Sequence, residues 1–272
     1  MASAAAPRKS GVADRLPLEV VLETAGLSKL FGGLTAVGEL DLKVFQGQIS
    51  SLIGPNGAGK TTVFNVVTGI YRPEGGRVLF EGEDITGLKP HLIVERGIAR
   101  TFQNIRLFSN LTCQENVMAG QHCRARAGLA AALFRPRSQR QEEEAIRLVA
   151  ERRLRQVGLW ESRDELARNI AYGRQRQLEI ARALATSPRL LVLDEPSSGL
   201  NPRETEDLME FIRRIIREER LTVLLIEHDM NVVMGISDWV TVMDGGRKIA
   251  EGPPQTIYRD PRVIEAYLGA GS

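Results

Sequence analysis

Nine consecutive residues near the start of the chain have the types and spacing needed to hold a row of phosphates. They fit the pattern G-x-x-x-x-G-K-[ST] and run Gly54, Pro55, Asn56, Gly57, Ala58, Gly59, Lys60, Thr61, Thr62. The glycines let backbone N–H groups turn toward anionic oxygens at the start of a helix, where Lys60 reaches the β- and γ-phosphates and the Thr61 hydroxyl binds Mg²⁺. We call residues 54–62 the phosphate cradle and predict that they bind a nucleotide.

A pair of adjacent carboxylates, Asp194 and Glu195, ends the apolar run at residues 190–193. Side chains alternate along a strand, so the two carboxylates enter different surroundings. Asp194 is suited to the Mg²⁺ shell, and Glu195 is suited to orient or deprotonate a water that attacks the γ-phosphate. The alternative is a strand that runs into an acidic turn before Pro196, but a buried run rarely ends in paired carboxylates without charged partners.

The pattern around these motifs predicts the elements that hold them in place. An apolar run at residues 49–53 indicates a buried strand before the cradle, and an amphipathic helix pattern follows it. After position 171, a helix, strands at 190–193 and 222–226 and an intervening helix alternate, which implies a parallel sheet. Asn201 and Glu204 fit a capping box at the start of the intervening helix.

Two regions depart from that alternation. Short β-like runs near residues 19–24, 34–44 and 77–80 predict antiparallel strands around the cradle, and residues 90–170 are rich in helix formers. We therefore expect an α/β fold in one domain after a disordered tail at residues 1–17. The expected parts of the domain at 18–272 are a nucleotide-binding core at 18–88 and 172–252, a helical lobe at 89–171 and a C-terminal segment at 253–272.

The composition argues against several classes of protein. Over 272 residues, 36 Lys and Arg against 34 Asp and Glu leave a net charge of +2, which argues against nucleic-acid binding driven by bulk charge. The two cysteines, Cys113 and Cys123, form neither a disulfide framework nor a CxxC metal site. No window approaches the roughly 18 consecutive apolar residues of a membrane-spanning helix.

The run from Ile170 to Leu184 reads Ile-Ala-Tyr-Gly-Arg-Gln-Arg-Gln-Leu-Glu-Ile-Ala-Arg-Ala-Leu, and here the chain resembles the ATP-binding subunits of ABC transporters. Their signature usually reads Leu-Ser-Gly-Gly-Gln before a basic helix, whose N-terminus faces the γ-phosphate held by a partner cassette. The resemblance implies that Ala171, Tyr172, Gly173 and Arg174 take this role. It also implies ATP and Mg²⁺ as cofactors and a second ATP-binding subunit, identical or homologous. The implied fold is a P-loop ABC ATPase with a RecA-like core sheet, an antiparallel β subdomain and a helical subdomain.

Other positions of the family have matches in this chain. Phe31, twenty-nine residues before Lys60, matches the aromatic residue that stacks on adenine, although an isolated Phe in a strand and turn is ordinarily core. Gln103 matches the glutamine that joins the two lobes and senses Mg²⁺ and the attacking water. His228 matches the histidine that contacts the γ-phosphate, and without the other motifs it would be a capping or surface residue. The resemblance thus implies catalytic roles for Glu195, His228 and Gln103 and a Mg²⁺ shell of Thr61, Gln103 and Asp194.

Further segments narrow the resemblance to the ATPase subunits of high-affinity branched-chain amino acid importers. These segments lie at residues 31–34, 100–103, 171–173, 199–202, 227–230 and 265–269. Importers of urea or short-chain amides share most of them and stay an alternative. The resemblance implies a peripheral location at the cytoplasmic face of the inner membrane, two integral membrane permease subunits and, indirectly, an extracytoplasmic solute-binding protein.

Residues 104–116 lie where members of the family grip a helix of the membrane subunit. The resemblance implies that Leu107, Phe108 and Leu111 form an apolar socket for that helix. For each of the three, packing inside the helical lobe is the alternative.

Three positions depart from the family pattern. Ala171 stands where a Ser hydroxyl is usual, and Asn201 stands where an Asp charge is usual. Arg174 stands at the position of the signature Gln. A cation in a first helical turn is disfavoured by the helix dipole but attracts a phosphate, so we hypothesise that Arg174 tunes ATP affinity in the dimer.

Two other classes of function compete with transport. A soluble ABC ATPase that acts on nucleic acid or the ribosome typically carries tandem cassettes, long coiled coils or zinc insertions, whereas this chain has one cradle, no sustained heptads and no Cys cluster. A guanine-nucleotide switch would need an Asn-Lys-x-Asp motif, which does not occur. We therefore expect no nucleic-acid partner.

Overall fold

The computed structural model describes residues 19–121 and 136–269. The predicted tail at residues 1–17 and Cys123 lie outside these ranges. Within them, no helix is both long enough and apolar enough to cross a membrane.

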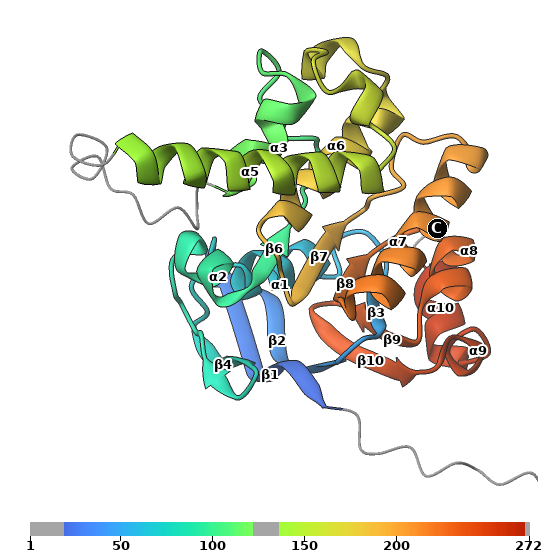
Figure 1. Cartoon of the computed structure of the whole chain (residues 1–272). Coiled ribbons are helices and arrows are strands. Elements are labelled where there is room, and N and C mark those ends of the chain that lie inside the picture. The colour runs from blue at the N-terminus through green and yellow to red at the C-terminus, as the bar shows by residue number, and fades with distance from the viewer. Residues whose placement is uncertain (1–18, 122–135, 270–272) are drawn as a thin grey trace, which may run out of the picture.

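A four-stranded antiparallel sheet forms one side of the molecule (Figure 1). Its strands, in the order β2-β1-β4-β5, are β1 (Val20–Phe31), β2 (Leu34–Phe45), β4 (Gly75–Phe80) and β5 (Glu83–Asp84). β1 runs further than the predicted run at 19–24, because register shifts between Thr24 and Leu27 interrupt the alternation of side chains without ending the pairing with β2. The antiparallel prediction is confirmed.

The cradle belongs to a second sheet of six strands in the order β10-β9-β3-β8-β7-β6. They are β3 (Ile49–Ile53), β6 (Ile98–Arg100), β7 (Leu190–Asp194), β8 (Thr222–Ile226), β9 (Trp239–Asp244) and β10 (Arg247–Gly252). All neighbouring pairs are parallel except β9 and β10. Every residue of β3, β7 and β8 is buried, as the unbroken apolar runs predicted.

One strand contradicts the predicted boundaries of the helical lobe. Residues 98–100 lie within the span expected to be helical, at 89–171, but they form β6 at the edge of the six-stranded sheet, paired with residues 190–192 of β7. Three residues are too few to show a period of two, and their pairing partner lies far away in the sequence. The helical part of the chain therefore resumes only after Arg100.

The helices cover both faces of this sheet. They are α1 (Lys60–Val67), α2 (Pro90–Arg96), α3 (Cys113–Gln121), α5 (Pro136–Gln156), α6 (Tyr172–Ala185), α7 (Pro202–Glu219), α8 (Met230–Ile236), α9 (Pro254–Ile257) and α10 (Pro261–Gly269), with 3₁₀ turns at Trp160–Ser162 and Ala167–Asn169. α3, α5 and α6 contact one another and lie together at the top of Figure 1. We call these three helices the helical lobe; α3 and α5 lie within the span predicted for it, at 89–171, whereas α6 begins one residue beyond that span.

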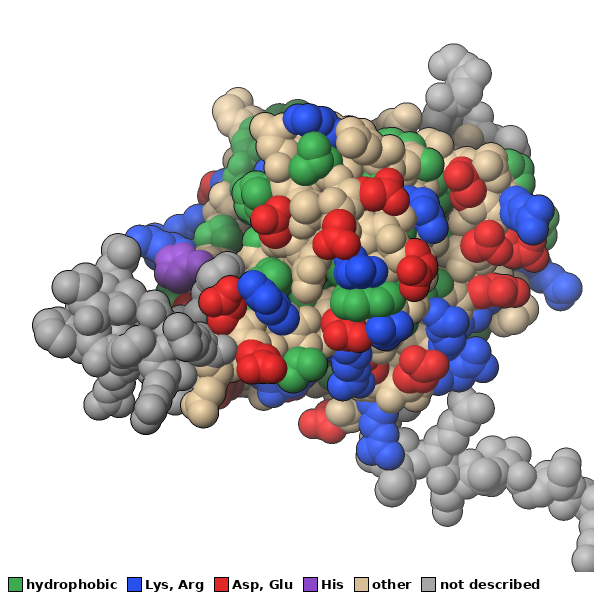
Figure 2. All heavy atoms as spheres, turned by 45° about the horizontal axis from the view of Figure 1, so that its top comes forward, with side chains coloured by type: hydrophobic (Ala, Val, Ile, Leu, Met, Phe, Trp, Pro, Cys, Tyr) green, Lys and Arg blue, Asp and Glu red, His purple; other side chains and the backbone are tan. Residues whose placement is uncertain are grey.

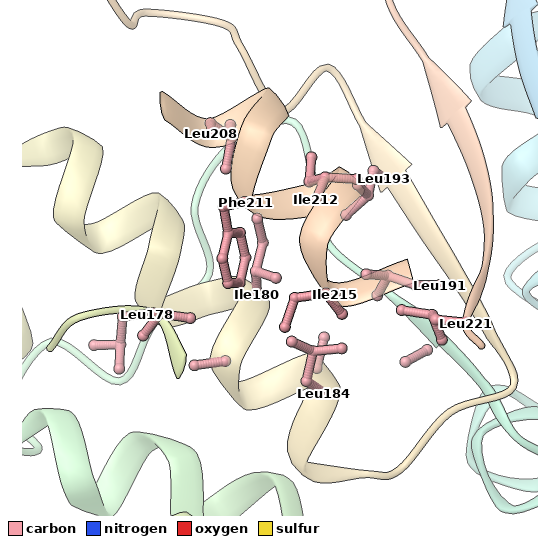
Figure 3. Close-up of a cluster of buried hydrophobic side chains, with 14 of the residues drawn as sticks. Leu178, Ile180, Leu184, Leu191, Leu193, Leu208, Phe211, Ile212, Ile215 and Leu221 are labelled. Carbon is pink, nitrogen blue, oxygen red and sulfur yellow. The ribbon is translucent and has the colours of Figure 1, made fainter. Parts of the chain in front are cut away.

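The side chains of β7 show how the sheet separates two parts of the core. Leu191 and Leu193 pack into a cluster with α6 and α7, which Figure 3 shows. Leu190 and Val192 point to the other face and pack with α1 and the antiparallel sheet. The backbone of β7 is thus packed between two apolar layers, and this packing fixes the position of its last residue, Asp194.

The predicted capping box at the start of α7 is present. The side chain of Asn201 accepts a hydrogen bond from the backbone N–H of Glu204 at 3.0 Å, and the carboxylate of Glu204 accepts one from the N–H of Asn201 at 2.9 Å. The buried stripe of α7 then follows at Leu208, Met209, Phe211, Ile212, Ile215 and Ile216.

The surface of the described residues carries mixed charge. On the face drawn in Figure 2, Lys and Arg side chains alternate with Asp and Glu side chains. This distribution accords with the net charge of +2.

Candidate nucleotide site

The phosphate cradle needs its glycines for two separate reasons. Gly54, Gly57 and Gly59 have φ values of 150°, 82° and 98°, which L side chains rarely adopt. A Cβ at Gly54 would also lie 2.0 Å from the carbonyl oxygen of Met243, and a Cβ at Gly59 would lie 2.3 Å from that of Ala36. Backbone conformation and close packing therefore both require glycine at the two ends of the loop.

Lys60 lies inside the loop that it is predicted to serve. Its side chain is buried, and its Nζ donates hydrogen bonds to the carbonyl oxygens of Gly54 at 2.7 Å and Pro55 at 2.9 Å. Burial lowers the pKa of this ammonium, while the charges of Glu195 and Asp194 act in the opposite direction. The cation is thus held among the carbonyl groups of the cradle, near the predicted catalytic carboxylate of Glu195 and the predicted Mg²⁺ ligand Asp194.

Asp194 is a buried carboxylate with a specific cation as its partner. Its Oδ2 lies 2.7 Å from Nη2 of Arg100, whose guanidinium also donates to the side chains of Asn65 at 2.7 Å and Thr68 at 3.0 Å. The pKa of Asp194 is raised, because burial outweighs the opposing effect of the hydrogen bond and charge of Arg100. Arg100 therefore fixes the position of Asp194 between β6, β7 and α1.

Three predicted catalytic side chains meet at one oxygen atom. Oε2 of Glu195 accepts a hydrogen bond from Nε2 of Gln103 at 2.8 Å, and Nδ1 of His228 lies 3.7 Å from the same oxygen. These residues follow β6, β7 and β8, which are neighbours in the sheet and parallel, so their carboxyl ends share one edge. The topology thus brings together residues that are far apart in the sequence.

The residues predicted to bind Mg²⁺ have the right chemistry for that ion. Thr61 is an exposed residue in the first turn of α1, and Asp194 supplies a buried carboxylate at the end of β7. Oxygen atoms of this kind are the ligands that Mg²⁺ prefers, together with phosphate oxygens and water. The amide of Gln103 is bound to Glu195, so a contact between Gln103 and the metal stays a prediction.

Phe31 lies on the surface, which contradicts the alternative that it is an ordinary core residue. Its side chain is 43% exposed and packs edge-to-face on Tyr71, with ring centroids 5.2 Å apart. Nζ of Lys29 lies 5.1 Å from the centre of the Phe31 ring and 2.7 Å from the carboxylate of Glu74. An exposed ring supported in this way is suited to stack on a base, and this role stays a prediction.

The predicted signature forms the start of α6. Ala171 is the N-cap residue and has no side-chain capping bond, while Ala171 and Tyr172 are both exposed. A Cβ at Gly173 would lie 3.0 Å from a carboxylate oxygen of Glu204, which restricts larger side chains there. The first N–H groups of α6 are therefore available at the surface for an anion.

Arg174 has a partner within the helical lobe. Its Nη1 donates to the hydroxyl of Ser162 at 3.1 Å. The other donors of the guanidinium are left for a phosphate, and unchanged ATPase kinetics in Arg174→Gln would contradict the predicted effect on ATP affinity.

The segment at residues 104–116 is divided between core and surface. Leu107 packs against the core cluster that α6 shares with α7 and the six-stranded sheet, whereas Phe108 is 54% exposed and its ring centre lies 5.6 Å from the guanidinium of Arg182. Packing thus accounts for Leu107, while Phe108 lines an open groove. The groove is lined by Arg106, Leu107, Phe108, Ala119, Glu179 and Arg182, among others.

Comparison with known proteins agrees with this geometry. Residues 37–198 match the family described as ABC transporter, and residues 247–272 match the family described as branched-chain amino acid ATP-binding cassette transporter. The chain is 50% identical over 250 residues to the high-affinity branched-chain amino acid transport ATP-binding protein BraF of Pseudomonas aeruginosa, covering 92% of this chain and 98% of that protein. LivG of Escherichia coli K12, which bears the same description, is 46% identical with the same coverage.

This chain belongs to the ATP-binding subunits of branched-chain amino acid ABC transporters. A solved structure of the ADP conformation of an ATP-binding cassette matches it with a TM-score of 0.80 at 33% identity, covering 92% of this chain and 99% of that one. The predicted family, the fold class and the ATPase activity are therefore confirmed, and the ABC ATPase core is a nucleotide-binding domain.

Three residues near the site of this ABC ATPase were not predicted. Arg100 partners Asp194, Tyr71 supports Phe31, and the buried carboxylate of Glu227 accepts hydrogen bonds from the N–H and hydroxyl of Ser197 at 2.9 and 2.5 Å. A buried carboxylate needs a cation or several donors, and this rule predicts that partners exist without saying which they are.

Proposed function

We propose that this ATPase hydrolyses MgATP at a site shared between two cassettes, and that hydrolysis energises the uptake of branched-chain amino acids. The observation that carries the catalytic part is the convergence of Gln103 and His228 on one oxygen of Glu195. A carboxylate that is hydrogen-bonded to Gln103, lies near His228 at the edge of the sheet and interacts electrostatically with Lys60 is suited to activate water next to a γ-phosphate.

Each residue of one chain then has a defined task. The nucleotide phosphates replace the two carbonyl partners of Lys60, and Phe31 stacks on the adenine. Thr61 and Asp194 hold Mg²⁺, which supplies Lewis-acid polarisation of the γ-phosphate when it is bound. Glu195 orients or deprotonates the attacking water, and His228 contacts the γ-phosphate.

The exposed start of α6 completes the site of the partner chain. Residues 171–174 meet the γ-phosphate held by the opposite cradle, where the helix dipole and the first N–H groups of α6 stabilise its charge. A closed pair of cassettes therefore holds two nucleotides, and each cassette completes the site of the other. The partner is identical or homologous to this chain.

ATP hydrolysis by this chain is coupled to transport across a membrane. The protein is peripheral at the cytoplasmic face of the inner membrane, with two integral permease subunits and, indirectly, an extracytoplasmic solute-binding protein. The exposed Phe108 and its groove are suited to receive a permease helix. The names of the relatives support branched-chain amino acids as the solute, and a related urea or amide importer is the alternative.

The solute is tested with the assembled complex in proteoliposomes. We expect ATP hydrolysis to rise when the solute-binding protein is loaded with leucine, isoleucine or valine, and to stay at its basal rate with urea or acetamide. Stimulation by urea alone would contradict the proposed solute. Stable association with nucleic acid in place of two membrane proteins would contradict the transport role.

A further inference from the structure

The signature helix α6 contains an ion pair that no motif explains. Arg176 and Glu179 face each other with Nη1 and Oε2 3.1 Å apart, and their side chains are 0% and 1% exposed. Removing two charges from water is costly, and their mutual attraction offsets the cost only when further hydrogen bonds satisfy the remaining donors and acceptors. A pair this deeply buried therefore needs additional partners.

The backbone partners of the pair come from the segment that carries Gln103, and within α6 itself Nη2 of Arg176 lies 3.5 Å from the hydroxyl of Tyr172. Nη1 of Arg176 donates to the carbonyl oxygen of Phe102 at 2.8 Å, and Nη2 donates to that of Gln103 at 2.9 Å. Oε1 of Glu179 accepts from the backbone N–H of Arg106 at 3.1 Å. The two side chains thus fasten residues 102–106 to α6, and we call them the α6 clamp.

The fork of the guanidinium explains why arginine serves this purpose. Its planar donors reach two consecutive carbonyl oxygens and a carboxylate at the same time. A lysine at position 176 could keep the ion pair with Glu179, but its single ammonium cannot reproduce the fork. Because the bonded atoms on the other segment are backbone atoms, the clamp holds the main chain at Gln103 directly.

From these contacts we infer that Arg176 and Glu179 are positioning residues, which transmit a displacement of α6 to Gln103 and from there to Glu195. The start of α6 lies four residues before Arg176, and the side chain of Gln103 donates to Glu195 at 2.8 Å. When the partner's nucleotide docks on α6, the clamp carries the backbone of Gln103 along. This inference rests on the catalytic roles proposed above for Gln103 and Glu195.

The clamp also borders the groove at Phe108. Glu179 and Arg106, which it joins, both line that groove. A permease helix bound in that groove would contact Glu179 and Arg106, which the clamp joins. One buried ion pair would therefore transmit displacements caused by the partner cassette and by the membrane subunit to the catalytic carboxylate.

A double-mutant cycle with Gln103 tests this inference in the full-length protein. The double variant Arg176→Met/Glu179→Met removes both charges together, because a single substitution would leave the other charge buried and unpaired. We expect this variant and Gln103→Ala each to lower kcat about 10-fold, with little change in the KM for ATP. If the clamp acts through Gln103, the triple variant should also fall only about 10-fold, since the two changes are not additive.

An exposed ion pair gives the matched control. Glu143 and Arg147 on α5 are 59% and 62% exposed, and Glu143→Gln/Arg147→Gln should change neither kcat nor KM. If the methionine pair does not fold, Arg176→Lys gives the same cycle, because it keeps the charge and loses the fork.

Two results would overturn the inference. One is a normal kcat in a folded clamp variant, and the other is an approximately 100-fold loss in the triple variant, which would show independent effects. Glu195→Gln separates this failure from a failure of the proposed site. If Glu195→Gln is inactive and the cycle is additive, only the clamp is refuted, whereas normal turnover by Glu195→Gln would refute the site itself.

Discussion

Glu195 has an unusual backbone conformation, with a φ of 46° in the left-handed region. This conformation costs a non-glycine residue about 1 to 2 kcal/mol. The N–H of Glu195 still donates to the carbonyl oxygen of Ile226 at 3.0 Å, so the chain stays attached to β8 as it leaves the sheet. The strained residue is thus the one whose side chain contacts Gln103 and lies near His228, and backbone strain of this kind is typical of functional sites.

Two glycines of the cradle should differ in how much an alanine substitution destabilises the protein. Gly57→Ala and Gly59→Ala both place a side chain at positive φ, but a Cβ at Gly57 meets no atom within 4 Å, while one at Gly59 lies 2.3 Å from the carbonyl oxygen of Ala36. We expect Gly57→Ala to lower the free energy of unfolding by about 1 kcal/mol and Gly59→Ala by at least twice as much. Urea denaturation of both variants checks this, and equal losses would show that the contact with Ala36 does not matter.

At the scale of elements, local patterns predicted most of the structure that carries the site. The buried strand β7, the cradle and the N-cap of α7 all depend on residues next to one another in the sequence. β6 and the α6 clamp could not be predicted in this way. β6 has three residues and takes its pairing from β7, and Arg176 finds its partners on a segment that precedes it by more than 70 residues.

The capping box of α7 should contribute measurably to the stability of the protein. Asn201→Ala removes the acceptor for the N–H of Glu204, so the free energy of unfolding should fall by about 1 kcal/mol. Asn201→Asp is the matched control, because it keeps an acceptor and adds a charge that favours a helix N-terminus. Thermal unfolding of the two variants should therefore differ. Equal melting temperatures would show that the box adds no stability.

The described residues form three layers, with the six-stranded sheet in the middle (Figure 1). The antiparallel sheet packs with the cradle helix α1 on one face of the six-stranded sheet, and α6 and α7 pack on the other. Gln103, Glu195 and His228 lie where these layers meet, at the carboxyl ends of three adjacent strands. The side chain of Glu195 is thus bonded to Gln103, whereas Lys60 is bonded to carbonyl groups of the cradle itself.

Glu195→Gln tests whether the cradle binds ATP and Glu195 drives its hydrolysis. The substitution keeps the size of the side chain and removes the carboxylate, so ATP binding by the cradle should be unchanged within about twofold while kcat falls at least 100-fold, roughly 3 kcal/mol. The measurement compares the ATP affinity of the full chain with its steady-state hydrolysis rate. Near-normal turnover in this variant would contradict the role of Glu195 in hydrolysis and the proposed catalytic site.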